Sequence, residues 1–294
     1  EEVTITGKHT KRPDIVIYLN GIAVGVLELK RSSVSISEGI RQNLDNQKKE
    51  FIQDFFTTVQ LVMAGNDTQG LKYGTIETPE RYYLEWKEEN PEYDHNKKSD
   101  IQRALPRDEC DVSNNILECD LYRLLNKERL LEIIHDFVIF DSGIKKLPRH
   151  NQYFGVKAAQ SNIKKREGGI IWHTQGSGKS LTMVWLAKWI IENIDDSRVL
   201  IITDRIELDE QIERVFRGVG ENIHRTESAK ELIEELNRKD ENLICSLVHK
   251  FGRAEPTEKD YSEYISELES VLPSNFEPKG NIFVFVDECH RNDI

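Results

Sequence analysis

The chain has 294 residues, of which 38% are hydrophobic and 31% are charged, so it holds enough apolar residues for two globular domains of ordinary size. Acidic residues outnumber basic ones by 52 to 40, and the resulting net charge of −12 excludes a wholly basic nucleic-acid coat protein, although not a local basic groove. No apolar run approaches the ~18 residues of a membrane span, and the start has no secretory signal. The 4 cysteines form no C-x-x-C pair and no disulfide framework, which predicts a reducing, cytoplasmic location.

The first strong pattern is a pair of β-rich runs, 14–19 and 22–27, on either side of Asn20-Gly21. An Asn-Gly pair between two such runs is typical of a tight hairpin turn. Both runs are apolar on both faces, so we expect this hairpin to lie in the centre of a sheet and not at its edge. The elements expected next are a polar helix, a strand and a turn, over 37–51, 59–64 and 65–70.

The middle of the chain separates two patterns. Residues 85–119 are polar and charged and are interpreted as an insertion or loop, while 121–137 has the apolar spacing of a helix that would connect two domains. From about residue 150, fully apolar runs alternate with helical stretches, which predicts an α/β fold with a parallel sheet covered by helices. The strands and helices expected there are 170–172, 179–193, 199–203, 205–217, 228–238, 243–248 and 282–286.

A glycine loop stands between the expected strand at 170–172 and the expected helix at 179–193. Its sequence from His173 to Ser180 is HTQGSGKS. Glycines allow consecutive backbone N–H groups to turn inward and bind an anion, and the start of a helix adds a partial positive charge. Lys179 would reach the β- and γ-phosphates of a nucleotide, and Ser180 would ligate Mg²⁺. The predicted phosphate-binding residues of this P-loop are Thr174, Gly176, Ser177, Gly178, Lys179 and Ser180.

An acidic segment follows the apolar run 282–286, where Asp287 and Glu288 precede Cys289 and His290. Carboxylates at the carboxyl end of a parallel strand lie at the edge of the sheet where ligands bind. Asp287 would hold Mg²⁺ through water, and Glu288 would polarise the water that attacks the γ-phosphate. Together with the glycine loop, this pair predicts an ATPase that needs Mg²⁺.

Charged residues at the two ends of the hairpin match the pattern PD-(D/E)xK, with Asp14 after a proline, Glu28, and Lys30 two positions later. Two carboxylates can hold a divalent metal, which lowers the pKa of a bound water and stabilises charge on a phosphate. Lys30 would orient that water or neutralise the charge of the transition state. Asp14 and Glu28 are therefore the predicted metal ligands of a nuclease, and Lys30 is its third catalytic group.

The geometry of the hairpin decides whether this centre can form. A plain two-residue turn at Asn20-Gly21 would place Asp14 opposite Leu27, so that Asp14 and Glu28 would face opposite sides of the sheet. A three-residue loop or one β-bulge would instead place Asp14 opposite Glu28, with Lys30 on the same face. The sequence leaves both arrangements open, and only the second is compatible with a metal site.

These motifs resemble those of the restriction (R) subunit of type I restriction–modification enzymes, within helicase superfamily 2. The resemblance is carried by Ile171–Met183, Ile202–Gln211 and Asp287–Arg291. In that family the loop commonly carries a histidine where a simple P-loop has glycine, as His173 does here, and Cys289 replaces the usual alanine of the acidic segment. A nuclease followed by a motor is also the order of domains in that family.

The resemblance implies a PD-(D/E)xK endonuclease domain with a mixed sheet over 1–140, with a connector helix near its end, and the first RecA-like ATPase lobe over 141–294. It implies translocation on double-stranded DNA coupled to cleavage, with ATP and Mg²⁺ as cofactors and the methylation (M) and specificity (S) subunits as partners, and no membrane. It also implies a second lobe beyond Ile294, so we expect the present chain alone to be inactive as a motor.

The family further implies a glutamine upstream of the P-loop that reads adenine, for which Gln152 is the candidate, with an ordinary surface glutamine as the alternative. The segment 203–205 and Lys250 would contact DNA. Gln42 lies in the expected helix after the nuclease centre, where the family often has Q-x-x-x-Y. Asn46 stands at the tyrosine position, and this departure leaves the role of Gln42 open.

Two other functions fit the same residues. One is another superfamily 2 helicase or translocase with a nuclease, such as a type III restriction subunit. The other is a non-catalytic, nucleotide-switched DNA-binding module whose hairpin is structural. Binding of a divalent metal by Asp14 and Glu28 would favour a nuclease over this module.

Overall fold

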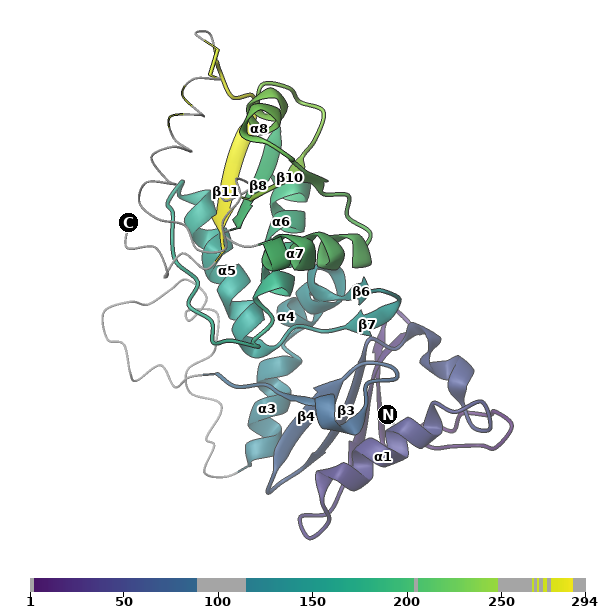
Figure 1. The fold of residues 1–294 in the computed structure, drawn as a ribbon. Coiled ribbons are helices and arrows are strands. Elements are labelled where there is room, and N and C mark those ends of the chain that lie inside the picture. The colour runs from purple at the N-terminus through teal and green to yellow at the C-terminus, as the bar shows by residue number, and fades with distance from the viewer. Residues whose placement is uncertain are drawn as a thin grey trace. The chain divides into compact units, whose positions relative to one another are not determined.

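The computed structural model describes residues 3–88, 115–203, 206–247, 266, 269, 272–273 and 276–287. The chain divides into two compact units, of which the first comprises 1–139 with 144–153 and the second 140–143 with 154–294 (Figure 1). Each unit has its own sheet and its own buried apolar residues. Within the described ranges, no helix is long and apolar enough to cross a membrane.

The first unit is built on a mixed sheet of 5 strands in the order β1-β2-β3-β4-β5. β2 and β3 are parallel, and the other neighbours are antiparallel. The strands are β1 (Ile15–Leu19), β2 (Ile22–Leu29), β3 (Leu61–Asn66), β4 (Gly70–Gly74) and β5 (Leu84–Glu85). The parallel step from β2 to β3 needs a crossover, which α1 (Ile36–Asn46) and the 3₁₀ helix η1 (Gln53–Thr58) supply. A second 3₁₀ helix, η2 (Glu80–Tyr82), precedes β5.

Helices approach both faces of this sheet. On one face, a Cβ atom added to Gly39 of α1 would lie 3.1 Å from the Cβ atom of Ala64. On the other face, α3 (Ile116–Leu124) comes so near that a Cβ atom added to Gly65 would lie 2.4 Å from Cδ1 of Leu117. Successive residues of a strand point to opposite faces, so β3 is covered from both sides. The close contacts explain why glycines stand where the helices cross.

The predicted connector helix over 121–137 is wrong as a single helix. The structure has α3, then α4 (Lys127–Glu132), which continues into the π-helix η4 (Ile133–Phe137). Asn126 interrupts the chain between α3 and α4, because its side chain accepts a hydrogen bond from the backbone N–H of Glu128. An asparagine that binds the first free N–H groups in this way starts a new helix.

The β1–β2 hairpin lies at one side of the described sheet, which corrects the expectation of a central position. β1 is the last strand in the sheet order, and β3 pairs with β2 only over Gly25–Leu29. The turn end of the hairpin therefore extends beyond its neighbour, and Tyr18 and Ile22 are 42% and 54% exposed. The part of β2 that β3 covers is buried as far as Glu28. The apolar pattern on both faces correctly predicted that β2 has neighbours on both sides, but β1 lies at the edge of the described sheet.

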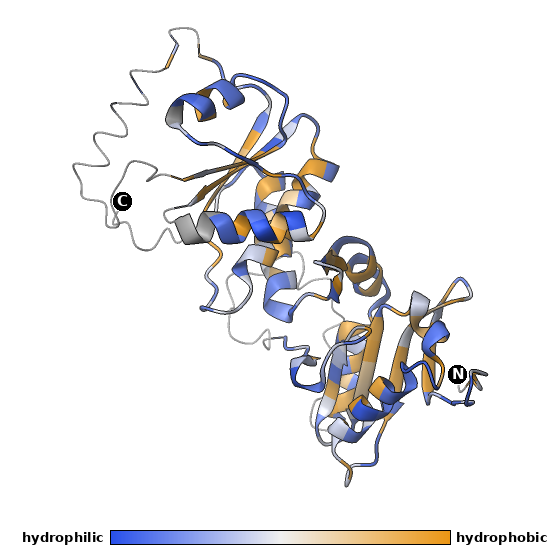
Figure 2. Cartoon of the chain, turned by 45° about the vertical axis from the view of Figure 1, so that its right-hand side comes forward, coloured by the Kyte–Doolittle hydropathy of each residue, from blue (hydrophilic) through white to orange (hydrophobic). Residues whose placement is uncertain are grey.

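The second unit contains a parallel sheet in the order β11-β8-β10-β9. Its strands are β8 (Ser197–Thr203), β9 (His224–Arg225), β10 (Leu243–Leu247) and β11 (Asn281–Val286). The helices of this part of the chain are α5 (His150–Lys164), α6 (Lys179–Asn193), α7 (Ile206–Gly218) and α8 (Ala229–Leu236). A two-stranded sheet is formed by β6 (Ile139–Asp141) and β7 (Ile144–Lys146). Figure 2 shows apolar residues concentrated in the strands, whereas the helices carry both apolar and polar residues.

Of the four strands predicted for this part, the last three are confirmed as β8, β10 and β11, and the predicted helix 179–193 is α6. The first predicted strand, 170–172, is wrong. No strand in the described ranges pairs with this run, and Ile170 and Trp172 are each 79% exposed. A strand needs backbone partners for its N–H and C=O groups, and an apolar sequence cannot supply them alone.

Two cysteines are described. Cys119 is disulfide-bonded, and Cys245 is a buried free thiol. The sequence did not predict the bond of Cys119. A single disulfide does not make a framework that would replace a hydrophobic core, and the cytoplasmic location stays a prediction.

Arg198 of β8 joins several segments of the second unit. Its side chain is buried, and the guanidinium donates hydrogen bonds to four backbone carbonyls. The acceptors are Glu235 (2.7 Å), Glu241 (2.9 Å), Leu236 (3.1 Å) and Lys279 (3.2 Å). These carbonyls belong to the end of α8 and to the chain before β10 and before β11. One buried cation therefore satisfies acceptors that have no strand partner there.

Replacing Arg198 by leucine should lower the free energy of unfolding by roughly 3 kcal/mol or more, because four backbone carbonyls would lose a charged donor. The carbonyls of Glu235 and Leu236 would each keep a backbone N–H donor. Urea titration followed by circular dichroism measures this loss. Lys239→Ala is the control, since it removes an ion pair with Asp196 in which both side chains are about half exposed. That change should cost less than about 1 kcal/mol. Equal stability of the two variants would contradict the assigned role of Arg198.

Candidate active sites

The β1–β2 hairpin combines a tight turn with a β-bulge. The turn has two residues, Asn20 and Gly21, and both have positive φ angles, 50° and 82°, as the common hairpin turn requires. The bulge follows directly in β2, where Val24 is the additional residue between the pairs Ile17–Gly25 and Tyr18–Ala23. The turn alone would therefore have given the unfavourable register, and the bulge shifts it by one residue.

The shifted register brings the two predicted carboxylates together. Beyond the bulge Ile15 pairs with Leu27, and continuing this register places Asp14 opposite Glu28. The backbone N–H of Leu29 donates a hydrogen bond of 2.8 Å to Oδ2 of Asp14. Of the two arrangements that the sequence left open, the structure thus has the one that is compatible with a metal site.

Side chains of α1 and β2 surround the carboxylate of Glu28, whose side chain is completely buried. Nε2 of Gln42 donates to its Oε2 at 2.7 Å, and Nδ2 of Asn46 lies 3.5 Å from its Oε1. The ammonium of Lys30 lies 3.9 Å from Oε2 and donates to Oε1 of Gln42 at 2.8 Å. Gln42 therefore bridges Lys30 and Glu28 with the two ends of its amide. This contact gives Gln42 a place in the cluster, which the sequence had left open.

Burial controls the ionisation of this cluster. The pKa of Glu28 is raised from 4.5 to about 8, first by desolvation and then by the charge of Asp14 and a hydrogen bond with it. The positive charges of Lys30 and Lys11 lower the pKa in part. Two adjacent carboxyl groups in such surroundings share a proton near neutral pH unless a cation replaces it.

The donor set fits a small hard cation. Carboxylate oxygens are the protein ligands that Mg²⁺ prefers, and this ion commonly binds to one or two carboxylates and keeps several waters. Among the described side chains, no group of three or more histidines, cysteines, aspartates or glutamates could hold a metal. Asp14 and Glu28 would therefore act as a pair, with one partly exposed and one buried carboxylate.

The stability of the metal-free protein should depend on Glu28 as the pH rises. A carboxyl group with a raised pKa contributes most stability below its ordinary pKa of 4.5, and the contribution is lost as the pH rises through about 8. Glu28→Gln keeps a neutral group at every pH. The melting temperature of this variant should therefore exceed that of the unchanged chain by a margin that grows between pH 5 and pH 9.

Scanning calorimetry in the presence of a chelator measures this difference. Glu38→Gln is the matched control, because Glu38 is a glutamate of α1 in the same unit and its side chain is 60% exposed. Its difference from the unchanged chain should stay nearly constant with pH. Parallel pH profiles for Glu28→Gln and the unchanged chain would show that Glu28 is ionised without cost.

The predicted P-loop lies before α6 in the second unit. Gly176 and Gly178 have φ angles of 75° and 85°, in the region that favours glycine. α6 begins at Lys179 after Gly178, which has no side chain to cap the helix, and the start of a helix carries the partial positive charge that favours an anion. Ser180 is in contact with α7, since Nε2 of Gln211 lies 3.4 Å from its Oγ. Loop and helix start together have the backbone properties of a phosphate-binding site.

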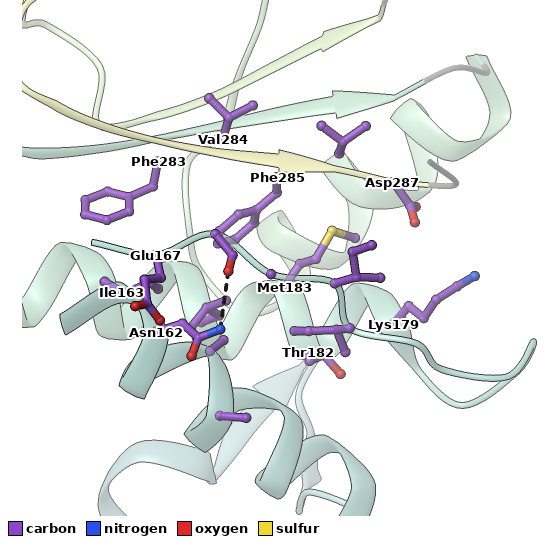
Figure 3. Close-up of a pocket in the computed structure, with 18 of the residues that line it drawn as sticks. Asn162, Ile163, Glu167, Lys179, Thr182, Met183, Phe283, Val284, Phe285 and Asp287 are labelled. Atoms are coloured by element: carbon purple, nitrogen blue, oxygen red, sulfur yellow. Dashed lines mark hydrogen bonds between the residues drawn. The ribbon is translucent and has the colours of Figure 1, made fainter. Parts of the chain in front are cut away.

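A cavity of about 580 Å³ lies beside this loop, between α5, the segment 167–173, α6 and β11. Lys179 and Asp287 both line it, and Figure 3 shows them at the same end of the cavity. Asp287 directly follows β11, and its N–H continues the ladder by donating to the carbonyl of Ile202 at 3.0 Å. The structure thus brings the lysine of the glycine loop and the first carboxylate of the acidic segment to one cavity.

Two further predicted residues, Gln152 and Thr203, lie within the described ranges. Gln152 is 3% exposed, and its Oε1 accepts a hydrogen bond of 2.9 Å from the N–H of Arg149 at the start of α5. It belongs to the first compact unit, whereas the P-loop belongs to the second. Thr203 is buried at the end of β8. The remaining predicted residues lie outside the described ranges: Asp204, Arg205, Lys250, Glu288, Cys289 and His290.

The sequence analysis missed two residues that act on Glu28, Asn46 and Lys11. Asn46 was noted only as a departure from a family pattern, yet its amide is within 3.5 Å of Glu28. Lys11 was not among the predicted site residues, yet its positive charge lowers the pKa of Glu28. The signal for Asn46 was its spacing, because residues 42 and 46 are one turn apart on a helix and therefore share a face. The position of Lys11 depends on the fold and had no such signal.

Two family models match the chain. The model described as the N terminus of the type I restriction enzyme R protein matches residues 1–81. The model described as the SWI2/SNF2 ATPase matches residues 151–294. The first match includes the cluster around Glu28, and the second includes the glycine loop and β11.

Curated relatives match almost the whole chain. The endonuclease subunit of the type I restriction enzyme HindI from Haemophilus influenzae is 28% identical over 302 residues, which cover 95% of this chain and 26% of that protein. A Methanocaldococcus jannaschii protein that is named as the MjaIXP type I restriction enzyme endonuclease subunit is 27% identical over 296 residues. The matched segment covers 96% of this chain and 27% of that protein. The SauCOLORF180P endonuclease subunit of Staphylococcus aureus is 23% identical over 296 residues, which cover 99% of this chain and 28% of that protein.

The chain therefore spans about a quarter of the length of the curated relatives that it matches. The matched segments include both candidate sites, and the order of the two family models along the chain is nuclease-subunit N terminus followed by ATPase. The chain therefore combines the N-terminal part typical of the type I restriction enzyme R protein with a domain of the SWI2/SNF2 ATPase type, and its relatives over almost its whole length are named type I restriction enzyme endonuclease subunits.

Proposed function

We propose that the chain is the part of a type I restriction subunit that cleaves DNA and begins its motor. Residues 1–140 would be the PD-(D/E)xK endonuclease domain, and 141–294 the first RecA-like lobe of an ATP-driven translocase. The observation that carries the proposal is the buried Glu28 beside Asp14, with Lys30 held against the same carboxylate by Gln42. A stable core would not place a charged pair and a lysine there without a use for them.

In the proposed nuclease, Asp14 and Glu28 hold Mg²⁺, which would supply a bound water of lowered pKa and a positive charge for the phosphate. Gln42 accepts a hydrogen bond from Lys30 and donates one to Glu28, so it keeps both groups in one orientation. Lys30 is 18% exposed at its side chain and can meet a phosphate while Glu28 stays buried. Its ammonium would neutralise charge that develops on the scissile phosphate.

In the proposed motor, the backbone N–H groups from Thr174 to Ser180 bind the phosphates of ATP. Lys179 faces the β- and γ-phosphates, and Ser180 and Asp287 hold the Mg²⁺ ion that accompanies ATP. The shared cavity of Lys179 and Asp287 supports these roles. Glu288, the proposed residue that polarises the attacking water, and Gln152, the proposed reader of adenine, stay predictions from the family resemblance.

The proposed substrate is double-stranded DNA, along which ATP hydrolysis drives translocation before cleavage. The proposed partners are the methylation and specificity subunits of a type I complex, because the relatives are subunits of such enzymes by name. The specificity subunit would select the DNA sequence.

Binding of Mn²⁺ in the absence of nucleotide tests the nuclease centre on this chain as it stands. Isothermal titration should show one site per chain, and Asp14→Asn should abolish it, because Glu28 alone leaves the ion a single carboxylate. Asp45→Asn is the matched control, since Asp45 is an exposed aspartate of the same unit that pairs with Lys48. A nucleotide-switched module with a structural hairpin would bind no Mn²⁺ in either form.

A further inference from the structure

Helix α1 turns amide side chains toward the sheet where an apolar face would be expected. Gln42, Asn43 and Asn46 lie on this side, and Asn43 and Asn46 are buried. Gly39, one turn earlier, allows the close approach, because a Cβ atom added there would lie 3.5 Å from the Cβ atom of Glu28. The helix therefore places its amides directly against the buried carboxylate.

Asn46 is costly at this position. Its side chain is 1% exposed, and its Oδ1 atom has no hydrogen-bond partner within the described part of the chain. A buried amide oxygen without a donor loses its hydration and gains nothing in exchange, whereas an apolar side chain of the same size would carry no such penalty. Stability of the fold does not explain an asparagine here.

The other half of the amide meets Glu28. Nδ2 of Asn46 is 3.5 Å from Oε1 of Glu28, while Nε2 of Gln42 is 2.7 Å from Oε2. The terminal torsion of a glutamate is broad when nothing restrains it. Donors at both oxygens restrain the plane of the carboxylate. Its other lone pairs are left for a proton shared with Asp14 or for a cation shared with Asp14.

We propose that Asn46 is a positioning residue that fixes the plane of the Glu28 carboxylate for the divalent cation bound between Glu28 and Asp14. This inference rests on the proposed nuclease function. Asn46 acts through Glu28 and does not itself touch the cation or the DNA. Groups that orient a metal ligand from behind commonly change metal affinity by about 10–100-fold when they are removed.

The test is Asn46→Leu, with Asn43→Leu as the matched control. Asn43 is also a buried amide of α1 with an unpartnered Oδ1 among the described residues, but its Nδ2 donates to the carbonyl of Met63 at 2.8 Å instead of to Glu28. Isothermal titration with Mn²⁺ on this chain should show affinity lower by about tenfold or more for Asn46→Leu, and an unchanged affinity for Asn43→Leu. In a chelator, the melting temperature of Asn46→Leu should be equal to or higher than that of the unchanged chain.

The cleavage kinetics of the complete complex give a second readout. Asn46→Leu should lower kcat and leave KM for DNA unchanged, because the substituted side chain does not meet the substrate. Asn46→Ser removes the amide with less bulk and should give the same loss of Mn²⁺ affinity if leucine does not fit. Unchanged Mn²⁺ affinity in both Asn46 variants, or an equal loss in Asn43→Leu, would overturn the inference. Asp14→Asn distinguishes failure of this inference from failure of the proposed nuclease function. If Asp14→Asn kept the Mn²⁺ site, the proposed metal centre itself would be wrong.

Discussion

Lys30→Ala in the complete subunit, assembled with the proposed methylation and specificity partners, is expected to reduce DNA cleavage by about 10²–10³-fold. The variant loses the ammonium that Gln42 holds beside Glu28, and with it the positive charge available to the scissile phosphate. ATP hydrolysis should stay within about twofold of the unchanged enzyme, because the glycine loop belongs to a different compact unit. Linearisation of circular, unmethylated DNA and release of phosphate measure the two activities in the same reaction.

Lys87→Ala is the control for this experiment. Lys87 is an exposed lysine of the same unit, 67% accessible at its side chain, and it pairs with Glu85. Both activities of this variant should match those of the unchanged enzyme. If Lys30→Ala lost cleavage and ATP hydrolysis to the same extent, the hairpin would have to be a structural element whose change unfolds the subunit.

Lys179→Ala is expected to have the second large effect, at the other site. It removes the cation that faces the β- and γ-phosphates at the start of α6, so ATP turnover should fall by about 10²-fold or more. Cleavage should fall with it, because the proposed mechanism requires translocation before the nuclease cuts. The nuclease centre itself should be intact, and Mn²⁺ binding in the absence of nucleotide should be unchanged.

Lys188→Ala is the matched control on the same helix, since Lys188 pairs with Glu221 at 2.7 Å and does not line the cavity. Its ATP turnover should be that of the unchanged enzyme. Cutting of circular DNA by the Lys179→Ala complex at the ordinary rate and without ATP would exclude the type I mechanism. Such a result would favour a nuclease that works independently of the motor.

The sequence showed that the register of the β1–β2 hairpin decides whether Asp14 and Glu28 face each other, but it could not predict the bulge in β2 that sets this register. Asn20-Gly21 correctly predicted a tight hairpin turn, and the two β-rich apolar runs correctly predicted two strands. The additional residue Val24 has no local signature, because a β-bulge depends on how two strands fit over their full length. Whether Asp14 and Glu28 face each other therefore depends on a feature that only the structure reveals.

Elements with strong local signals were predicted well, and elements that depend on distant partners were not. α6 has the predicted bounds, because a glycine loop fixes its start and apolar periodicity continues through it. The run at 170–172 has the composition of a strand but no partner among the described strands. The short strand β4 was missed, because its five residues begin and end with glycine and contain a lysine.

The amides of α1 were the least predictable part of the site. A polar helix was expected over 37–51, and the observed helix ends at Asn46. Polar residues face solvent on most helices. The structure instead buries Asn43 and Asn46, because the neighbouring Glu28 is itself polar and buried. Periodicity of apolar residues cannot reveal a buried face that is made of amides.

Anomalous scattering from crystals of this chain soaked in Mn²⁺ tests the central claim most directly. The account predicts one peak, in the absence of nucleotide, within about 2.0–2.6 Å of a carboxylate oxygen of Asp14 and of one of Glu28. Crystals of Asp14→Asn treated in the same way should show no peak there. Saturating Mn²⁺ that leaves the position between these two carboxylates empty in the unchanged chain would contradict the assignment of a nuclease centre.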